Sequence, residues 1–116
     1  MESWDIRSLD VQPHKPQVLR SDDEARLIAI NLPAGERLQD HRVHERAYLM
    51  IVDGEVEVTE GDHTETGGPG FLAEFDPNET RELKATSDAR LVLILAPWPG
   101  KGHSSERAGG GDPEGV

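Results

Sequence analysis

The sequence predicts an all-β barrel or sandwich, and three observations support this fold class. Short apolar or alternating runs recur about every ten residues, a spacing typical of strands in all-β domains. Within these runs the hydrophobic period is two rather than 3.6. No stretch is long and regular enough to predict a helix. The predicted strands cover residues 17–20, 26–32, 47–52, 55–59, 71–75, 81–85 and 91–96.

Turn-forming residues separate the predicted strands, because Gly, Pro, Asn and Asp adopt the backbone conformations that reverse a chain. These turns are Pro33-Ala34-Gly35, Asp53-Gly54, Gly67-Gly68-Pro69-Gly70, Asp76-Pro77-Asn78 and Ser87-Asp88. The Asp53-Gly54 pair predicts a tight hairpin between residues 47–52 and 55–59, with Gly54 at the positive φ that such a turn requires. The polar sequence around His63 is predicted to be a turn without a specific role.

The alternation of side chains assigns the faces of the predicted strands. Val56 and Val58 alternate with polar neighbours, so residues 55–59 have one buried face and one solvent face. Residues 47–52 are apolar on both faces, and residues 91–96 repeat this pattern. Strands of this kind need a cover outside the barrel, which either the N-terminal segment or another subunit can provide. The sequence therefore predicts a homodimer.

The C-terminal sequence differs from the rest of the chain in composition. Six of the twelve glycines lie in residues 99–116, where Val116 is the only aliphatic residue besides one alanine. Such a segment buries too little apolar surface to offset its ordering entropy. The predicted organisation is an N-terminal segment, residues 1–24, packing on the barrel, a barrel over residues 25–98, and a disordered tail over residues 99–116.

The charge and the cysteine count exclude several classes of function. The 116 residues include 12 Lys and Arg against 23 Asp and Glu, which gives a formal net charge of −11. This excess of negative charge argues against nucleic acid and against an anionic membrane surface as partners. No apolar run reaches the length of a membrane span, and the first residues do not resemble a signal peptide. The absence of cysteine excludes thiolate metal sites and leads us to expect a cytoplasmic protein.

Two segments of the sequence resemble the motifs of the cupin family, whose members are double-stranded β-helix, jelly-roll-like barrels. The first family motif reads G, five residues, H-x-H, three or four residues, E, six residues, G, and is similar to the segment from Gly35 through His41 to Gly54. The second reads G, five residues, P-x-G, two residues, H, and is similar to the segment from Gly70 to Arg81. The resemblance covers about residues 25–97 and implies a small single-domain cupin.

The same resemblance implies the loss of the usual metal site. Cupins that hold a metal use the two His and the Glu of the first motif together with the His of the second. At the positions of these four ligands, this sequence has His41, Val43, Ala47 and Arg81. Only His41 retains a ligating side chain, so the resemblance implies a cupin without the metal tetrad.

A non-standard metal site is the alternative. His44 and Glu45 follow His41 closely, and at a corner or bulge His44 can point to the same side as His41. Glu45 shares the parity of Ala47 and is expected on the inner face. The set His41, His44 and Glu45 suits Zn, Fe or Mn and would support an isomerase- or oxygenase-type enzyme. The competing interpretation is a solvated corner loop in which the two histidines are close only in sequence.

Arg81 is the most informative residue, because it shares a face with Leu83 and Ala85. A buried arginine is rare unless it is paired. Three placements are open: an ion pair with Glu45, a bidentate grip on a small anionic ligand, or a strand end at which the guanidinium reaches water. Gln39 shares the parity of His41, and two placements are open for it: it lines the same pocket or faces solvent.

These observations lead us to expect a small-molecule-binding or sensing module rather than an enzyme. Its ligand-binding residues are predicted to be His41, Arg81, Gln39 and Glu45, and its ligand a small anion. No cofactor is expected on this hypothesis. On the alternative hypothesis, a divalent metal binds to His41, His44 and Glu45, and the protein is a metal-dependent enzyme.

Overall fold

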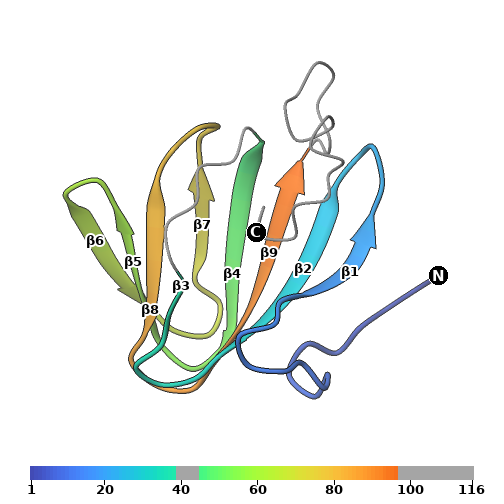
Figure 1. Cartoon of the computed structure of the whole chain (residues 1–116), viewed down its shortest axis with the longest axis horizontal. Coiled ribbons are helices and arrows are strands. Elements are labelled where there is room, and N and C mark those ends of the chain that lie inside the picture. The colour runs from blue at the N-terminus through green and yellow to red at the C-terminus, as the bar shows by residue number, and fades with distance from the viewer. Residues whose placement is uncertain (39–44, 97–116) are drawn as a thin grey trace.

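The computed structural model describes residues 1–38 and 45–96, which form two antiparallel β-sheets (Figure 1). Sheet A has the strand order β1-β2-β9-β4-β7, and sheet B has the order β3-β8-β5-β6. The strands are β1 (Gln17–Ser21), β2 (Arg26–Leu32), β3 (Arg37–Leu38), β4 (Arg46–Asp53), β5 (Val56–Glu60), β6 (His63–Gly67), β7 (Leu72–Phe75), β8 (Arg81–Ala85) and β9 (Ala89–Ala96). The described residues contain no helix, so the all-β prediction is confirmed and no helix among them could span a membrane. The predicted tail lies outside the described residues.

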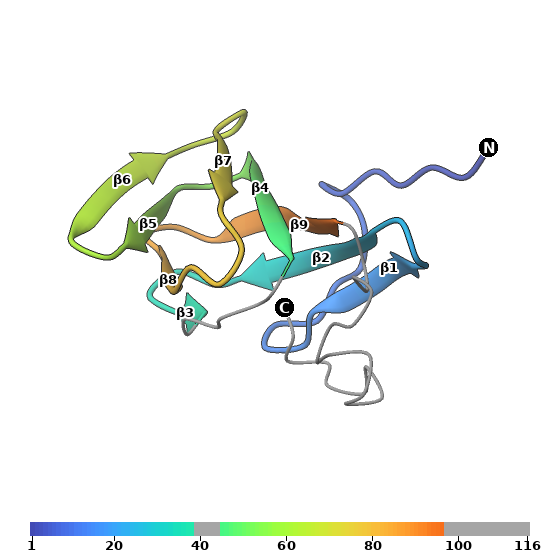
Figure 2. The ribbon, with the colours of Figure 1, turned by 90° about the horizontal axis from the view of Figure 1, so that it is seen from above.

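The hydrophobic core fills the space between the two sheets, which the view from above shows as two facing layers (Figure 2). Leu91, Leu93 and Leu95 on β9 are fully buried, while the residues between them are half-buried. Strand β4 has the same pattern, with Leu49 and Ile51 fully buried. The alternation predicted from the sequence is therefore confirmed, because successive side chains of a strand point to opposite faces.

The hairpin predicted at Asp53-Gly54 is wrong, although Gly54 has the expected positive φ of 82°. Strand β4 pairs with β7 and β9 in sheet A, whereas β5 pairs with β6 and β8 in sheet B. The short link thus crosses from one sheet to the other. A Cβ atom at Gly54 would lie 2.1 Å from the carbonyl oxygen of Asp88, so this crossing needs glycine for space as well as for conformation.

The prediction of a turn around His63 is wrong, because strand β6 begins at this residue. Residues 63–66 of β6 are exposed and polar, so their sequence lacks the apolar alternation that predicts a strand. Backbone pairing with β5 and a 2.9 Å hydrogen bond between the hydroxyls of Thr59 and Thr64 hold the strand in place. The two-residue strand β3 was also not predicted, because it is too short to show a period.

The N-terminal segment lies against the outer face of sheet A. The side-chain amide of Asn31 donates to the carbonyl oxygen of Val11 over 3.0 Å, and Val11 is 3% exposed. On the neighbouring strand the Arg90 guanidinium donates to the carbonyl oxygens of Ile6 and Leu9. The segment therefore covers the outer face at Asn31 and Arg90, and the homodimer stays a prediction.

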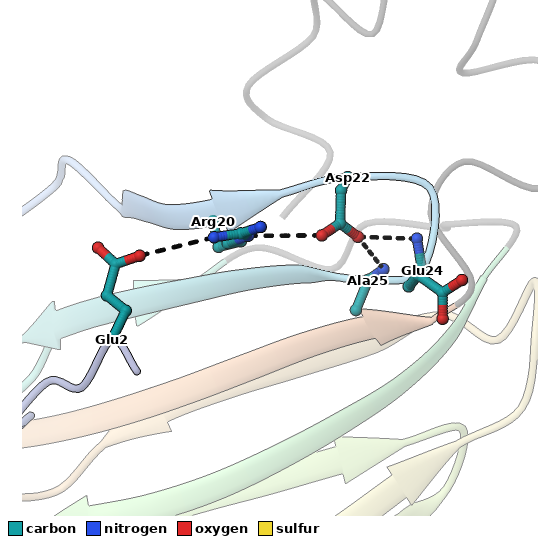
Figure 3. Close-up of polar contacts among 5 residues, drawn as sticks. All are labelled: Glu2, Arg20, Asp22, Glu24 and Ala25. Carbon is teal, nitrogen blue, oxygen red and sulfur yellow. Dashed lines mark hydrogen bonds and ion pairs between the residues drawn. The ribbon is translucent and has the colours of Figure 1, made fainter.

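The turn between β1 and β2 is held by the side chain of Asp22 (Figure 3). Its carboxylate accepts hydrogen bonds from the backbone N–H groups of Glu24 and Ala25 at 2.8 and 3.1 Å, and these bonds lower its pKa. Arg20 forms exposed ion pairs with Asp22 and Glu2. Asp22 thus closes the turn by satisfying two backbone donors.

Candidate functional site

We call one end of the barrel the mouth. It is the end at which β2 and β8 begin and β7 ends, and it lies at the top of Figure 1. The strand register places Arg26, Leu95, Ala47 and Phe75 in one row across β2, β9, β4 and β7. A short turn then leads from Phe75 to Arg81 at the start of β8. The mouth therefore brings residues from distant parts of the chain to one edge of the core.

Arg81 points into the barrel at the mouth. It is 5% exposed and alternates with Glu82 and Lys84, so it shares the inner face of β8 with Leu83 and Ala85. Its guanidinium carbon lies 5.3 Å from the centroid of the Phe75 ring, a distance at which a cation is attracted to an aromatic face. Burial lowers the pKa of Arg81, because desolvation disfavours the charged form. The placement in which the guanidinium reaches water is therefore wrong.

Glu45 is the second buried charged residue at the mouth. It is 3% exposed and directly precedes β4, where its parity with Ala47 predicts an inward direction. The burial agrees with the predicted inner-face position. Glu45 and Arg81 are the two fully buried charged residues of the part of the chain that the structure describes.

Arg26 is a further residue of the mouth, and the sequence reasoning missed it. It lies opposite Leu95 in the inner row, and its Nε and Nη1 atoms are buried. The sequence contains a signal for this inward position, because Arg26 shares the parity of Ile28 and Ile30 in the same run. The described part of the mouth thus combines two guanidinium groups with one buried carboxylate.

The remaining predicted site residues, Gln39, His41 and His44, lie outside the described residues. Their contribution to a ligand or metal site stays a prediction. Among residues 1–38 and 45–96, no group of three or more His, Asp or Glu side chains could hold a metal ion.

His63 lines a pocket of about 200 Å³ between the two sheets, near the mouth. Strands β5 and β6 form one side of this pocket, and residues from Phe71 onward in and before β7 form the other. The imidazole Nε2 lies 2.8 Å from a carboxylate oxygen of Glu65. The sequence reasoning assigned His63 no role because it placed the residue in a turn.

Comparison with known proteins identifies the family of this chain. Residues 28–97, more than half of the chain, match the family model described as "Cupin domain". The chain belongs to the cupin family. No curated protein matches this cupin.

Solved structures agree with this assignment. An RmlC-like cupin with a double-stranded β-helix fold from Methanocaldococcus jannaschii has a TM-score of 0.74 at 19% identity, covering 87% of this cupin and 94% of that chain. An RmlC-like cupin from Desulfovibrio desulfuricans has a TM-score of 0.75 at 16% identity, covering 84% and 97%. The Schizosaccharomyces pombe Cnp3 cupin domain has a TM-score of 0.74 at 18% identity, covering 92% and 80%. At these identities the likeness shows the fold alone.

The described residues do not fit the usual cupin metal site. At the Glu position of the first motif stands Ala47, which is 1% exposed and has no donor atom. At the His position of the second motif stands Arg81, whose guanidinium carries only N–H donors and cannot ligate a cation. A buried positive charge at this position would also repel a metal ion.

Proposed function

We propose that this cupin is a small-molecule-binding or sensing module whose mouth holds the anionic group of its ligand. The observation that carries the proposal is the burial of the Arg81 guanidinium on the inner face of the barrel. A guanidinium offers two parallel N–H donors that match a carboxylate or phosphate. Within a protein of net charge −11, a buried cation at the family's ligand position favours an anionic ligand.

Arg26 supports the proposal. Arg26 and Arg81 bring two guanidinium groups to the mouth, where Glu45 is also buried. Two guanidinium groups at one end of the barrel offer N–H donors from two strands to an anionic ligand. Gln39 and His41, which precede Glu45 in the chain, complete the proposed ligand site.

Variants of Arg81 test this proposal. We expect Arg81→Lys and Arg81→Gln to weaken the binding of small monocarboxylates or inorganic phosphate at least tenfold, because lysine keeps the charge but loses the bidentate geometry. Isothermal titration calorimetry measures the affinities. Arg37→Gln is the matched control, since Arg37 is exposed and bound to Glu82 at 2.7 Å. If neither probe binds, or if the Arg81 variants bind as tightly as the wild type, the proposal is wrong.

The alternative function is a metal-dependent enzyme with ligands His41, His44 and Glu45. The burial of Glu45 favours it, because a carboxylate held inside the barrel is a suitable ligand for a divalent metal. On this alternative, the purified protein holds nearly one metal ion per chain, His44→Ala loses it, and His63→Ala retains it. Elemental analysis of the three proteins decides between the two functions. A wild-type protein without bound metal excludes the alternative.

A further inference from the structure

The N-terminal residues 1–11, which we call the strap, have one apolar side and one solvent side. Val11 is 3% exposed. The other strap residues that are not fully exposed are Trp4, Ile6 and Leu9, and the residues between them are exposed and mostly polar. The strap, dark blue in Figure 1, therefore directs its apolar side chains at the barrel.

Two side chains of sheet A hold the main chain of the strap. The Asn31 amide donates to the carbonyl oxygen of Val11 over 3.0 Å, and the Arg90 guanidinium donates to the carbonyl oxygens of Ile6 and Leu9. Asn31 and Arg90 lie opposite each other on β2 and β9, so their donors form one patch. These bonds depend only on the main chain and its position. The strap of a second copy can therefore form the same bonds on this patch.

The charges of the strap and of the surface that receives it are opposite. The strap carries three carboxylates and one arginine side chain. The receiving surface contributes Arg90 and also Arg20, whose guanidinium lies 3.6 Å from a Glu2 carboxylate oxygen. Two copies of a chain with a net charge of −11 repel each other over most of their surface. The strap is thus a place where two copies can meet with opposite charges.

Residues 12–16, which we call the hinge, connect the strap to β1. His14 has a φ of 63°, a left-handed conformation that is unfavourable for a residue with a side chain. A 3.3 Å hydrogen bond from the Lys15 N–H to the Gln12 carbonyl oxygen holds the hinge in a turn. Gln12 and Lys15 each precede a proline, which favours extended backbone at these residues. A short hinge under strain favours the exchange of the segment that it connects.

We infer that two copies of this cupin exchange their straps, so that the strap of each copy binds to Asn31 and Arg90 of the other. A fully extended hinge of five residues spans at most about 17 Å, which lets the strap reach a copy beside the edge strand β1. The bonds of the strap are the same in the monomer and in the dimer. Relief of the strained hinge therefore offsets the entropy lost on association. This exchange is independent of the ligand proposed for the mouth.

Nuclear magnetic resonance of a mixed dimer tests the exchange directly. Isotope-labelled and unlabelled wild-type chains are unfolded together in urea and refolded. We expect isotope-filtered spectra to show a contact between the Asn31 amide of one copy and Val11 of the other, because these groups are hydrogen-bonded. If the protein is a dimer in which this contact stays within one copy, the inference is wrong. If the wild type stays monomeric at about 1 mM, the inference is also wrong, because even a weak dimer assembles at this concentration.

Substitutions at His14 test the role of the hinge. His14→Gly removes the strain of the positive φ and should raise the dimer dissociation constant at least tenfold, measured by analytical ultracentrifugation. His14→Pro cannot adopt this φ, so it should open the hinge and lower the dissociation constant at least tenfold. Both variants lose the contact between Nδ1 of His14 and a Glu36 carboxylate oxygen 3.3 Å away, so this loss cannot explain opposite shifts. Gln12→Gly is the matched control, since Gln12 is an exposed hinge residue without a positive φ.

The direction of these shifts decides whether the hinge controls association. Opposite shifts for the two His14 variants, together with the contact between copies, confirm the exchange. If both variants shift the dissociation constant in the same direction, or not at all, the inference is wrong. If Gln12→Gly weakens the dimer as much as His14→Gly does, chain flexibility rather than strain is responsible, and the inference is again wrong.

Discussion

The end of the barrel opposite the mouth, which we call the closed end, contrasts with the mouth in the kind of polar group that it holds. At the closed end, residues 33–36, 53–55 and 85–88 bond to one another. The Asp88 carboxylate accepts from the backbone of Ala34 at 2.8 Å, and the Ser87 hydroxyl accepts from the backbone of Glu55 at 2.9 Å. The Gly35 N–H donates to Ala85 at 2.8 Å. At the mouth, by contrast, the buried polar side chains are those of the ionisable residues Arg81 and Glu45.

This difference separates residues that stabilise the fold from residues available for function. Turn side chains that bond to backbone donors near them stabilise the fold at little cost in desolvation. Burying an ionisable side chain costs desolvation free energy, which interactions with its surroundings must offset. Ionisable groups kept in such surroundings are candidates for binding sites. The closed end therefore accounts for the shape of the barrel, and the mouth is where a ligand is expected.

Gly54→Ala is expected to have the largest effect on stability. The new Cβ would lie 2.1 Å from the Asp88 carbonyl oxygen, at a φ of +82°. Strain and overpacking together should lower the free energy of unfolding by about 3 kcal/mol, measured by urea denaturation. Gly35→Ala is the matched control: its φ is +84° but nothing lies within 4 Å of the new Cβ, so a loss of only about 1 kcal/mol is expected. Equal losses in the two variants would show that the closed end is not closely packed.

Leu72→Glu is expected to have an intermediate effect, on self-association rather than on folding. Leu72 and Met50 are opposite each other on the outer face of sheet A and are 60% and 37% exposed. If a second copy covers this face, the new charge should raise the dimer dissociation constant at least tenfold, measured by analytical ultracentrifugation. Val18→Glu, at the other edge strand and 39% exposed, is the control. If Leu72→Glu leaves the dimer intact, the interface lies elsewhere. An interface at the mouth would contradict the proposed entry of a ligand there.

Asp22→Ala is expected to have the smallest effect, at the exposed turn between β1 and β2. The backbone N–H groups of Glu24 and Ala25 lower the pKa of Asp22 below its usual value of 3.8. A carboxylate with a lowered pKa in the folded state contributes stability above pH 3.8, and this contribution is lost as the pH falls through the lowered pKa. The wild type should therefore melt slightly above the variant at neutral pH, and the difference should disappear in acid. Asp23→Ala is the control, and a pH-independent difference would contradict this account.

The period-two pattern was sufficient to predict most of the fold. The runs 26–32 and 81–85 coincide with β2 and β8, and the inward direction of Arg81 followed from its parity with Leu83. The spacing of the family motifs around Gly35, Gly54 and Gly70 was sufficient to indicate the cupin fold. Glu45, expected on the inner face from its parity with Ala47, is 3% exposed. Each of these features depends on residues close together in sequence, which is why local patterns reveal them.

The features of the fold that the sequence did not predict depend on contacts between residues far apart in the chain. Strand β6 has no apolar period, and only its pairing with β5 makes it a strand. The Asp53-Gly54 turn conformation was predictable, but the assignment of β4 and β5 to different sheets was not. A turn sequence determines the local backbone conformation, whereas the partners of a strand are chosen by the burial of both its faces.

The sequence by itself therefore determined most of the strands, their buried faces and the presence of an inward arginine in an acidic chain without cysteine. Only the tertiary structure decided which residues surround that arginine. Arg26 reaches the mouth through its row with Leu95. The register of three strands places Glu60 opposite Arg81 and His63 opposite Glu60. The physical reason is that alternation encodes the direction of a side chain relative to its own strand. The neighbours that it meets depend on hydrogen-bond registers between strands that are far apart in the chain.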